Sequence, residues 1–431
     1  MFREINRDEA GYIPELADNF DKRLEVLADG LEVKGFYEEA RGAGIYQIFW
    51  KVRAREDVEC LYLFAGRKNL CFLGGLKAGE TAEGNCYTHI CEIIPRYYDA
   101  VMEIEKVCFT AACESMEKLE ILELRVEKVR ESGKESGPER KCADGENGSC
   151  ASGQKSGLSE VPVVFLAGDS TVTDQSCEIP YNPGTCYSSW GQALTFYVGQ
   201  CAAVDNQAHC GLSTETFRNE GHFDIVERAI RPGDYCLFQF GHNDQKLPHL
   251  QAETGYRDNL LRFLEEIRQK GGIPVLVTPL GRNTWKEDGS YNDLLWEHTE
   301  AVKRIGRETD TPVINLHEFS VNFYLKNGKV KSRDYFHPAD ATHTNEYGAY
   351  LFAGVIADGL KAIDEKRFGN VRERAQSAEF VPEDSVWDRV NGGADGRNKT
   401  KEQKEQFDAA EKSVENLVAI VEKARKDAGN C

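Results

Sequence analysis

The sequence contains no apolar run that approaches the roughly 20 residues a helix needs to cross a bilayer. The first nine residues, MFREINRDE, also have no apolar core of the kind that a signal peptide carries. We therefore expect no membrane partner, and a cytoplasmic rather than a secreted protein.

Positive charge is scarce, with 53 Lys and Arg against 72 Asp and Glu and a net charge of −19. A polyphosphate would be repelled overall, so we expect no nucleic-acid partner. The 14 cysteines fall at irregular spacings without a Cys-x-x-Cys pair. In a large chain without a signal sequence, this pattern is typical of reduced thiols.

The 431 residues divide into four segments by composition and periodicity. Residues 1–130 contain several short alternating runs and little helix, which predicts an N-terminal β-sandwich with an accessory role. Leu122, Leu124 and Val126 alternate with charged residues there, and we expect them on one buried face. Residues 131–160 are rich in Gly, Ser, Lys and Glu, which predicts a flexible linker.

Residues 161–365 alternate between buried strand patterns and amphipathic helical patterns. This alternation predicts an α/β domain with a mostly parallel sheet and helices on both faces. The predicted strands are 161–167, 202–208, 234–241, 272–279 and 312–316, and the predicted helices include 256–270, 291–307 and 345–362.

The charged tail, 366–431, ends in a predicted helix with one apolar face. Its apolar residues recur at spacings of three and four, namely Phe407, Ala410, Val414, Leu417, Val421 and Ala424. Because fewer than three heptads are present, we expect this face to dock onto the body of the protein rather than to form a coiled-coil dimer.

Four short stretches follow predicted strands or precede the last helix of the α/β segment. They are GDSTV at 168–172, NQAHCGLS at 206–213, GHND at 241–244 and DATHTN at 340–345. Ligands bind at the carboxyl ends of the strands in an open α/β sheet. We therefore expect the four stretches to meet at one site.

These stretches hold the residue types that acyl transfer needs. A serine hydroxyl is a weak nucleophile until a base takes its proton, and Ser170 with His343 could fill these two roles. Asp340 could orient the imidazole of His343 and stabilise the imidazolium. The N–H groups of Ser170 and Gly211, with the side-chain amide of Asn243, could form an oxyanion hole.

A zinc site is a second interpretation of the last stretch, since His337, Asp340 and His343 form a His-x-x-Asp-x-x-His pattern. Under that interpretation Ser170 and Asn243 would have no purpose. We favour the acyl-transfer interpretation, and we expect neither a metal ion nor a cofactor.

The four stretches resemble the sequence blocks of the SGNH, or GDS-type, hydrolase superfamily, which carry Ser, Gly, Asn and Asp-x-x-His in this order. Within it, Gly-Asp-Ser-Thr-Val, Asn-x-Ala-x-x-Gly-x-Ser and Asp-x-Thr-His-Thr are similar to the rhamnogalacturonan acetylesterase family. The resemblance covers about 161–362, roughly half of the chain. Leu212 departs from the family pattern, which has arginine there, so the exact sugar stays open.

The resemblance implies a flavodoxin-like sheet and metal-free removal of acetyl groups from pectin. It places the catalytic triad on Ser170, Asp340 and His343 and the oxyanion hole on Ser170, Gly211 and Asn243. For substrate binding we expect Trp190, whose ring could stack on a sugar, and the cations Lys246 and Arg282, which could pair with pectin carboxylates.

Three other functions remain open from the sequence. A GDS-type lipase or thioesterase acting on other acyl esters would share the same four stretches. An acetylesterase acting on another glycan, such as xylan, would share them as well. A non-catalytic carbohydrate-binding protein could also use this scaffold, because a fold does not guarantee an activity.

Overall fold

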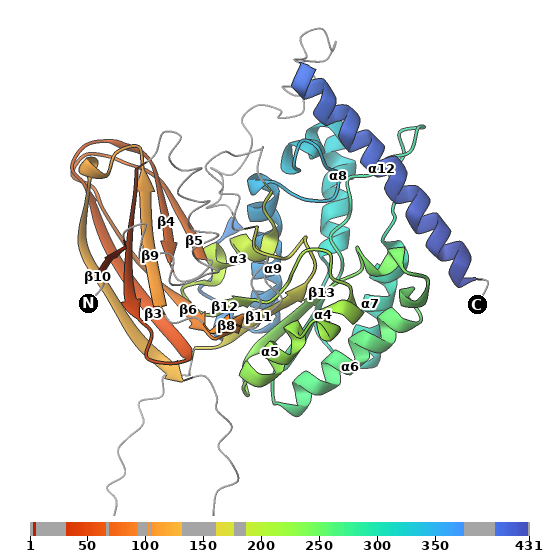
Figure 1. Ribbon diagram of the computed structural model, residues 1–431, viewed down its shortest axis with the longest axis horizontal. Coiled ribbons are helices and arrows are strands. Elements are labelled where there is room, and N and C mark those ends of the chain that lie inside the picture. Colours follow the sequence, from red (N-terminus) through yellow and green to blue (C-terminus); the bar gives the residue numbers. More distant parts are fainter. Residues whose placement is uncertain are drawn as a thin grey trace, which may run out of the picture.

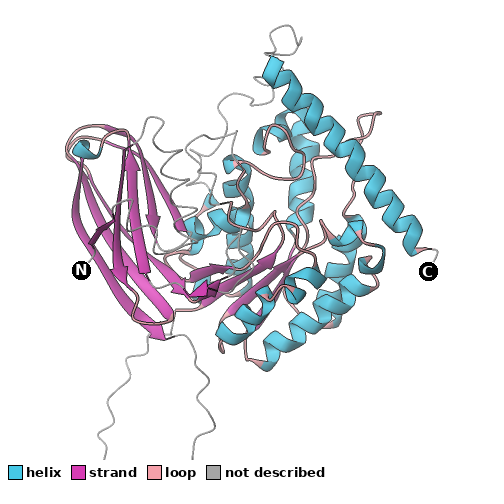
Figure 2. Ribbon diagram, in the orientation of Figure 1, coloured by secondary structure: helices cyan, strands magenta, loops and turns pink. Residues whose placement is uncertain are grey.

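A computed structural model describes residues 3–5, 32–65, 69–93, 102–103, 106–131, 161–175, 187–374 and 401–429. The linker predicted for 131–160 lies outside these residues, except for Glu131, which ends a strand. The described helices and strands form one layered body (Figures 1 and 2).

An eight-stranded sheet runs through the molecule in the order β10-β3-β6-β12-β11-β13-β14-β15. Its second half consists of β12 (Ala203–Asn206), β11 (Val163–Gly168), β13 (Tyr235–Gln239), β14 (Ile273–Val277) and β15 (Val313–Ile314). Each of these strands pairs in parallel with its neighbour. The prediction of a mostly parallel α/β sheet is therefore confirmed.

Strand β11 is apolar along its whole length because its two faces pack into two different hydrophobic cores. Val164 and Leu166 belong to one core, and Phe165 belongs to the other. Successive side chains of a strand point to opposite faces, so a strand covered by helices on both sides needs no polar face.

Helices cover both faces of this parallel sheet (Figure 1). The first core packs against α3 (Trp190–Val198), α8 (Leu316–Ser332), α9 (Glu346–Ile363) and α10 (Glu365–Phe368). The second core packs against α4 (Thr214–Asn219), α5 (His222–Ala229), α6 (Gly255–Gln269) and α7 (Trp296–Glu308). Two short 3₁₀ turns, η2 (Asp244–Lys246) and η3 (Pro248–Leu250), follow β13.

The N-terminal strands form two facing sheets that share a core. One sheet has the order β1-β2-β9-β4-β5, and its strands are β1 (Arg3–Ile5), β2 (Glu32–Glu39), β9 (Lys106–Cys113), β4 (Val58–Ala65) and β5 (Asn69–Leu76). Opposite it lie β3 (Gly44–Ala54), β6 (Thr81–Ile90) and β10 (Leu119–Glu131). Ile48, Trp50, Leu63 and Phe109 are buried between the two.

Smaller elements complete this half of the molecule. They are β7 (Glu92–Ile93), which pairs with β8 (Met102–Glu103), and the 3₁₀ turn η1 (Met116–Lys118). Strand β6 also pairs in parallel with β12, matching Tyr87 with Ala203 and Thr88 with Val204. The N-terminal strands thus continue the parallel sheet, and a separate sandwich domain stays a prediction.

Strand β10 departs from the simple alternation that its sequence predicts. Its pairing with β3 shifts register between Ile121 and Glu123, which is the mark of a β-bulge. Leu122 is consequently 40% exposed, whereas Ile121, Leu124 and Val126 pack against the N-terminal core. The expectation that Leu122 lies on the buried face is wrong, because the extra residue of the bulge turns that side chain outward.

Two buried polar networks lie where the N-terminal strands meet the parallel sheet. The Arg130 guanidinium pairs with both carboxylate oxygens of Asp234, with 2.6 Å between Nη2 and Oδ2. In the second network, His89 Nδ1 and the Cys91 thiol both contact Asp205 Oδ2, at 2.6 and 2.8 Å. Asp205 and Asp234 are 3% and 0% exposed, so both contacts are shielded from water.

Helix α12 (Lys401–Ala428) lies on the outside of the molecule beside α8 (Figure 1). Ala410, Val421 and Ala424 on its inner face are buried. Glu411 bridges Lys329 and Arg333 of the body at 3.1 and 3.0 Å. Three of the six residues of the predicted apolar face are thus buried, and the side chain of Phe407 lies outside the described residues. None of the helices among the described residues has the length and hydropathy to span a membrane.

Candidate active site

A pocket of about 370 Å³ opens at the carboxyl ends of the parallel strands. It brings together residues from all four sequence stretches. The lining residues are Ser170, Gln175, Tyr187, Cys210, Gly211, His242, Asn243, Lys246, Arg282, Asp340, Thr342 and His343.

The turn after β11 presents Ser170 to this pocket. A Cβ atom on Gly168 would lie 2.6 Å from Val172 Cγ2 and 2.8 Å from the Gln239 carbonyl oxygen, so only glycine fits there. The Asp169 carboxylate accepts hydrogen bonds from the Thr171 N–H at 2.9 Å and the Thr171 hydroxyl at 2.8 Å. This Asx-type turn fixes the backbone on both sides of Ser170.

Ser170, His343 and Asp340 form a continuous chain of hydrogen bonds, although the first two residues are 173 positions apart. Ser170 Oγ lies 2.7 Å from His343 Nε2, and His343 Nδ1 lies 2.6 Å from Asp340 Oδ2. A carboxylate at Nδ1 favours the tautomer in which Nε2 is free to accept the serine proton. The predicted nucleophile, base and acid are therefore within reach of one another.

Asp340 is held in its ionised form by several donors. Burial would raise the pKa of this carboxyl, but the adjacent His343 ring and two backbone N–H groups outweigh burial and keep the pKa well below its usual range. The donors are the N–H groups of Thr342 and His343, at 2.5 and 3.0 Å from Oδ1. Hydrogen bonds to the charged form stabilise that form.

Two of the predicted oxyanion donors are backbone N–H groups that can bond to a substrate oxygen. Among the described residues, the backbone N–H groups of Ser170 and Gly211 have no acceptor, whereas those of their neighbours Thr171 and Leu212 donate to Asp169 and His209. Gly211 has φ = +83°, in the left-handed region that glycine adopts without strain. This conformation suits glycine for presenting its N–H group at the pocket.

The third predicted donor is the side-chain amide of Asn243, and two hydrogen bonds fix which way the amide points. Nδ2 donates to the Leu212 carbonyl oxygen at 2.9 Å, and Oδ1 accepts from Lys246 Nζ at 2.9 Å. A carbonyl only accepts and an ammonium only donates, so the amide cannot be reversed without losing both bonds. One N–H of Nδ2 is left for a substrate oxygen.

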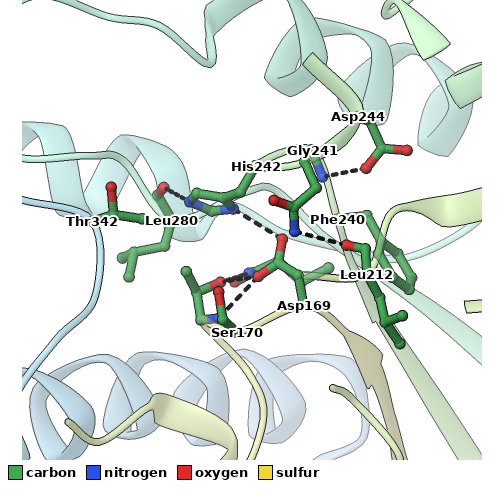
Figure 3. A network of polar contacts seen from close by, with 12 residues as sticks. Asp169, Ser170, Leu212, Phe240, Gly241, His242, Asp244, Leu280 and Thr342 are labelled. Atoms are coloured by element: carbon green, nitrogen blue, oxygen red, sulfur yellow. Dashed lines mark hydrogen bonds and ion pairs between the residues drawn. The ribbon is translucent and has the colours of Figure 1, made fainter. Parts of the chain in front are cut away.

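Asp244 accepts hydrogen bonds from both of the loops that carry Gly211 and Asn243. Its carboxylate accepts from the Thr214 N–H at 2.9 Å and the Thr214 hydroxyl at 2.6 Å. It also accepts from the Gly241 N–H at 3.2 Å (Figure 3). Burial raises the pKa of Asp244 to about 6, although the bonds from Thr214 act in the opposite direction. Gly241 has φ = +128°, which allows the sharp turn after β13.

A second acid–imidazole pair lies beneath Ser170, and the sequence did not reveal it. His242 Nδ1 lies 3.2 Å from Asp169 Oδ2, and His242 Nε2 lies 2.9 Å from the Leu280 carbonyl oxygen (Figure 3). Burial alone would raise the pKa of Asp169, but His242 and the bonds from Thr171 bring it to about 2. Both residues belong to recognised stretches, yet their contact depends on how two strand ends are placed.

The expected substrate-binding residues have different locations. Lys246 and Arg282 line the pocket. Arg282 is only 3% exposed, and its guanidinium donates to the His242 carbonyl oxygen and the Thr342 hydroxyl. Trp190 requires a correction: its ring is 1% exposed in the core, where Nε1 donates to Gln239, so it is not placed to stack on a sugar.

Tyr187 is the aromatic residue that does line the pocket. Its ring stacks on His337, with centroids 3.8 Å apart, and meets the His343 ring edge-on at 5.8 Å. The His337 ring is thus packed against an aromatic face, while Asp340 and His343 bond to each other. This arrangement supports the acyl-transfer interpretation over the zinc interpretation of the same three residues.

Comparison with known proteins agrees with this geometry. Residues 166–345 match the model of the GDSL-like lipase/acylhydrolase family. The rhamnogalacturonan acetylesterase RhgT of Bacillus subtilis is 35% identical over 213 residues, which cover 46% of this chain and 90% of that protein. The probable rhamnogalacturonan acetylesterase YesY of the same organism is 32% identical over 208 residues, covering 46% and 93%. A rhamnogalacturonan acetylesterase of Emericella nidulans is 25% identical over 224 residues, covering 46% and 84%.

The parallel sheet, the four motifs and these relatives define the class of the protein as a serine carboxylic ester hydrolase. The chain belongs to the GDSL-like lipase/acylhydrolase family, within the SGNH superfamily, and resembles its rhamnogalacturonan acetylesterases.

Proposed function

We propose that this protein removes acetyl groups from pectin-type (rhamnogalacturonan) poly- or oligosaccharides. The observation that carries the proposal is the hydrogen-bonded chain from Ser170 through His343 to Asp340 at the edge of the pocket. The substrate class is supported by the relatives, whose names give rhamnogalacturonan acetylesterase activity.

In the proposed reaction Ser170 Oγ attacks the acetyl carbonyl carbon while His343 Nε2 accepts the hydroxyl proton. The N–H groups of Ser170 and Gly211 and the Asn243 amide stabilise the tetrahedral oxyanion. The C–O bond to the sugar then breaks, and His343 returns the proton to the departing sugar oxygen. Water, deprotonated by His343, attacks the acetyl-enzyme. The ester bond to Ser170 Oγ then breaks, His343 returns the proton to that oxygen, and acetate leaves.

The polar lining and the volume of the pocket support a substrate that carries a short acyl group on a polar molecule. Most of its lining side chains are polar or charged, and its volume of about 370 Å³ suits an acetyl group with part of a sugar ring. A lipase or thioesterase for long acyl chains would need an extended apolar groove. The acetylesterase proposal is therefore favoured over that alternative.

A Ser170→Ala variant tests the mechanism. Losing the nucleophile should lower kcat for acetate release by about 10⁴-fold or more, the scale seen when a triad member is removed. Ser115→Ala, in the N-terminal region, serves as the matched control and should behave like the unaltered protein. Acetate release at the unaltered rate by Ser170→Ala would refute the triad assignment.

A substrate panel tests the specificity. We expect acetate release from acetylated rhamnogalacturonan to exceed that from acetylated xylan, and p-nitrophenyl acetate to be cleaved faster than the octanoate ester. The reverse order in either comparison would favour the xylan or the long-chain alternative. A fluorophosphonate probe should label Ser170, and absence of labelling would favour a non-catalytic carbohydrate-binding protein.

A further inference from the structure

Lys246 places an ammonium group in the pocket, next to the side-chain amide of Asn243. It follows Asn243 by three positions, at the end of the 3₁₀ turn η2, and residues three apart in such a turn lie on the same side. Its Nζ donates to Asn243 Oδ1 at 2.9 Å. Across the described part of the chain, no Asp or Glu oxygen lies within ion-pair distance of it, and the side-chain hydrogen bond that it makes there is the one to Asn243.

We propose that Lys246 is a positioning residue for the oxyanion hole, which holds and polarises the Asn243 amide. The inference rests on the proposed function and deepens it, because it names the group that makes one of the three oxyanion donors effective. Among the described residues, the Lys246 ammonium bonds to Asn243 Oδ1 and not to Ser170.

The Asn243 amide is held at both of its ends by hydrogen bonds. An amide can rotate by half a turn, and the reversed form would present Oδ1, an acceptor, to the developing oxyanion. The Leu212 carbonyl holds Nδ2 at one end, and Lys246 holds Oδ1 at the other. Without Lys246 only the bond to Leu212 would resist reversal.

The charge of Lys246 adds a second effect. A cation at the amide oxygen draws electron density from the nitrogen, which strengthens the remaining N–H as a donor. Hydrogen bonds polarise one another most strongly where water is excluded. Donors that are oriented before the reaction stabilise the transition state without reorganisation. The effect of Lys246 should therefore appear in kcat.

A double-mutant cycle tests this coupling. The variants are Lys246→Met, Asn243→Ala and the two combined, assayed on p-nitrophenyl acetate, which carries no carboxylate. We expect Lys246→Met to lower kcat by about tenfold or more with little change in KM, since removing a whole oxyanion donor costs about 10²–10³-fold. In the Asn243→Ala background the same change should lower kcat by less than about twofold, because coupled residues are not additive.

Three controls separate the possible outcomes. Lys286→Met, at an exposed position, should leave kcat unchanged. Lys246→Arg keeps a charged donor and should retain part of the activity that Lys246→Met loses. Thermal unfolding shows whether each variant is folded.

Several results would overturn the proposal. They are unchanged kcat in a folded Lys246→Met variant, equal losses with and without Asn243, or a rise in KM confined to uronate-containing substrates. The last result would assign Lys246 to carboxylate binding. Failure of the proposed function is a different result: Ser170→Ala would retain activity, the unaltered protein would have none, or the substrate panel would favour another ester. Failure of this inference leaves an active protein that Ser170→Ala inactivates.

Discussion

At the scale of single residues, the two oxygens of the Asp340 carboxylate contact different groups. Oδ1 accepts the backbone N–H groups of Thr342 and His343, and Oδ2 faces His343 Nδ1. An asparagine in its place would keep its oxygen on the backbone donors, which would turn its NH₂ group toward Nδ1. The imidazole would then carry its proton on Nε2 and could not accept one from Ser170.

Asp340→Asn should consequently lower kcat by about 10⁴-fold while the fold is kept, as expected for a base in the wrong tautomer. Steady-state assays on p-nitrophenyl acetate, with circular dichroism to confirm folding, measure both quantities. Asp258→Asn on the exposed face of α6 is the control. An Asp340→Asn variant with nearly full activity would show that Asp340 does not orient His343.

The pH dependence of kcat should report the charge of Lys246. Burial and the nearby Arg282 lower the pKa of Lys246 to about 8, while Asp169 and Asp340 act in the opposite direction. The ammonium is present below that pH and is lost above it, so kcat should fall as pH rises through about 8. The fall should be absent in Lys246→Met, and an identical alkaline limb in both proteins would contradict this explanation.

That the site residues meet in one place could be predicted, because each stretch carries its reactive residue types within a few positions and follows a strand end or precedes the last helix. Ser170, Gly211, Asn243, Asp340 and His343 all reach one pocket. The contact between Asp169 and His242 could not be predicted, since it depends on the relative placement of two strands. Trp190 shows the opposite error, because an aromatic residue after a strand end looks the same in sequence whether it lines a pocket or a core.

At the scale of elements, the Asp244 carboxylate bonds to both of the loops that carry the proposed oxyanion donors Gly211 and Asn243. Asp244→Ala would leave the Thr214 N–H and hydroxyl and the Gly241 N–H without their acceptor. Buried groups that lose a partner cost about 1–3 kcal/mol. We expect a loss of stability of that size, and a lower kcat because Gly211 and Asn243 would no longer be held together.

Urea denaturation and steady-state kinetics on the same preparation measure the two effects. Asp258→Ala on α6, which is exposed, should change neither quantity. A stable Asp244→Ala variant with normal kcat would show that the loops keep their positions without this carboxylate.

The elements themselves could largely be predicted from the sequence. Buried strands and amphipathic helices have strong periodic patterns, and the predicted helices 256–270 and 345–362 correspond to α6 and α9 within one residue at each end. The bulge of β10 could not be predicted, because an inserted residue reverses the alternation without changing the composition. Leu122 is exposed for this reason.

At the scale of the whole molecule, the Arg130–Asp234 pair joins residues 104 positions apart. Asp234 also accepts the Val163 N–H at 2.8 Å, so it anchors the start of β11. Removing one member of a buried pair leaves an uncompensated charge, which costs about 3–5 kcal/mol. Asp234→Ala should lower the free energy of unfolding by that amount.

Chemical denaturation followed by fluorescence measures this loss. The control is Glu92→Ala, which breaks the exposed ion pair with Arg228 and should cost less than about 1 kcal/mol. Equal losses in the two variants would show that the buried pair adds little. The long-range pairing could not be predicted, because nothing near Arg130 in the sequence indicates its partner.

The parallel pairing of β6 with β12 also bears on attempts to shorten the enzyme. A version that starts at residue 161 would lack β6 and would make β12 an edge strand. Backbone N–H and C=O groups along Ala203–Asn206 would then have no partner strand on that side. Bare sheet margins recruit strands from other molecules. Such a minimal enzyme would need a substitute strand or added charges along that margin to stay in solution.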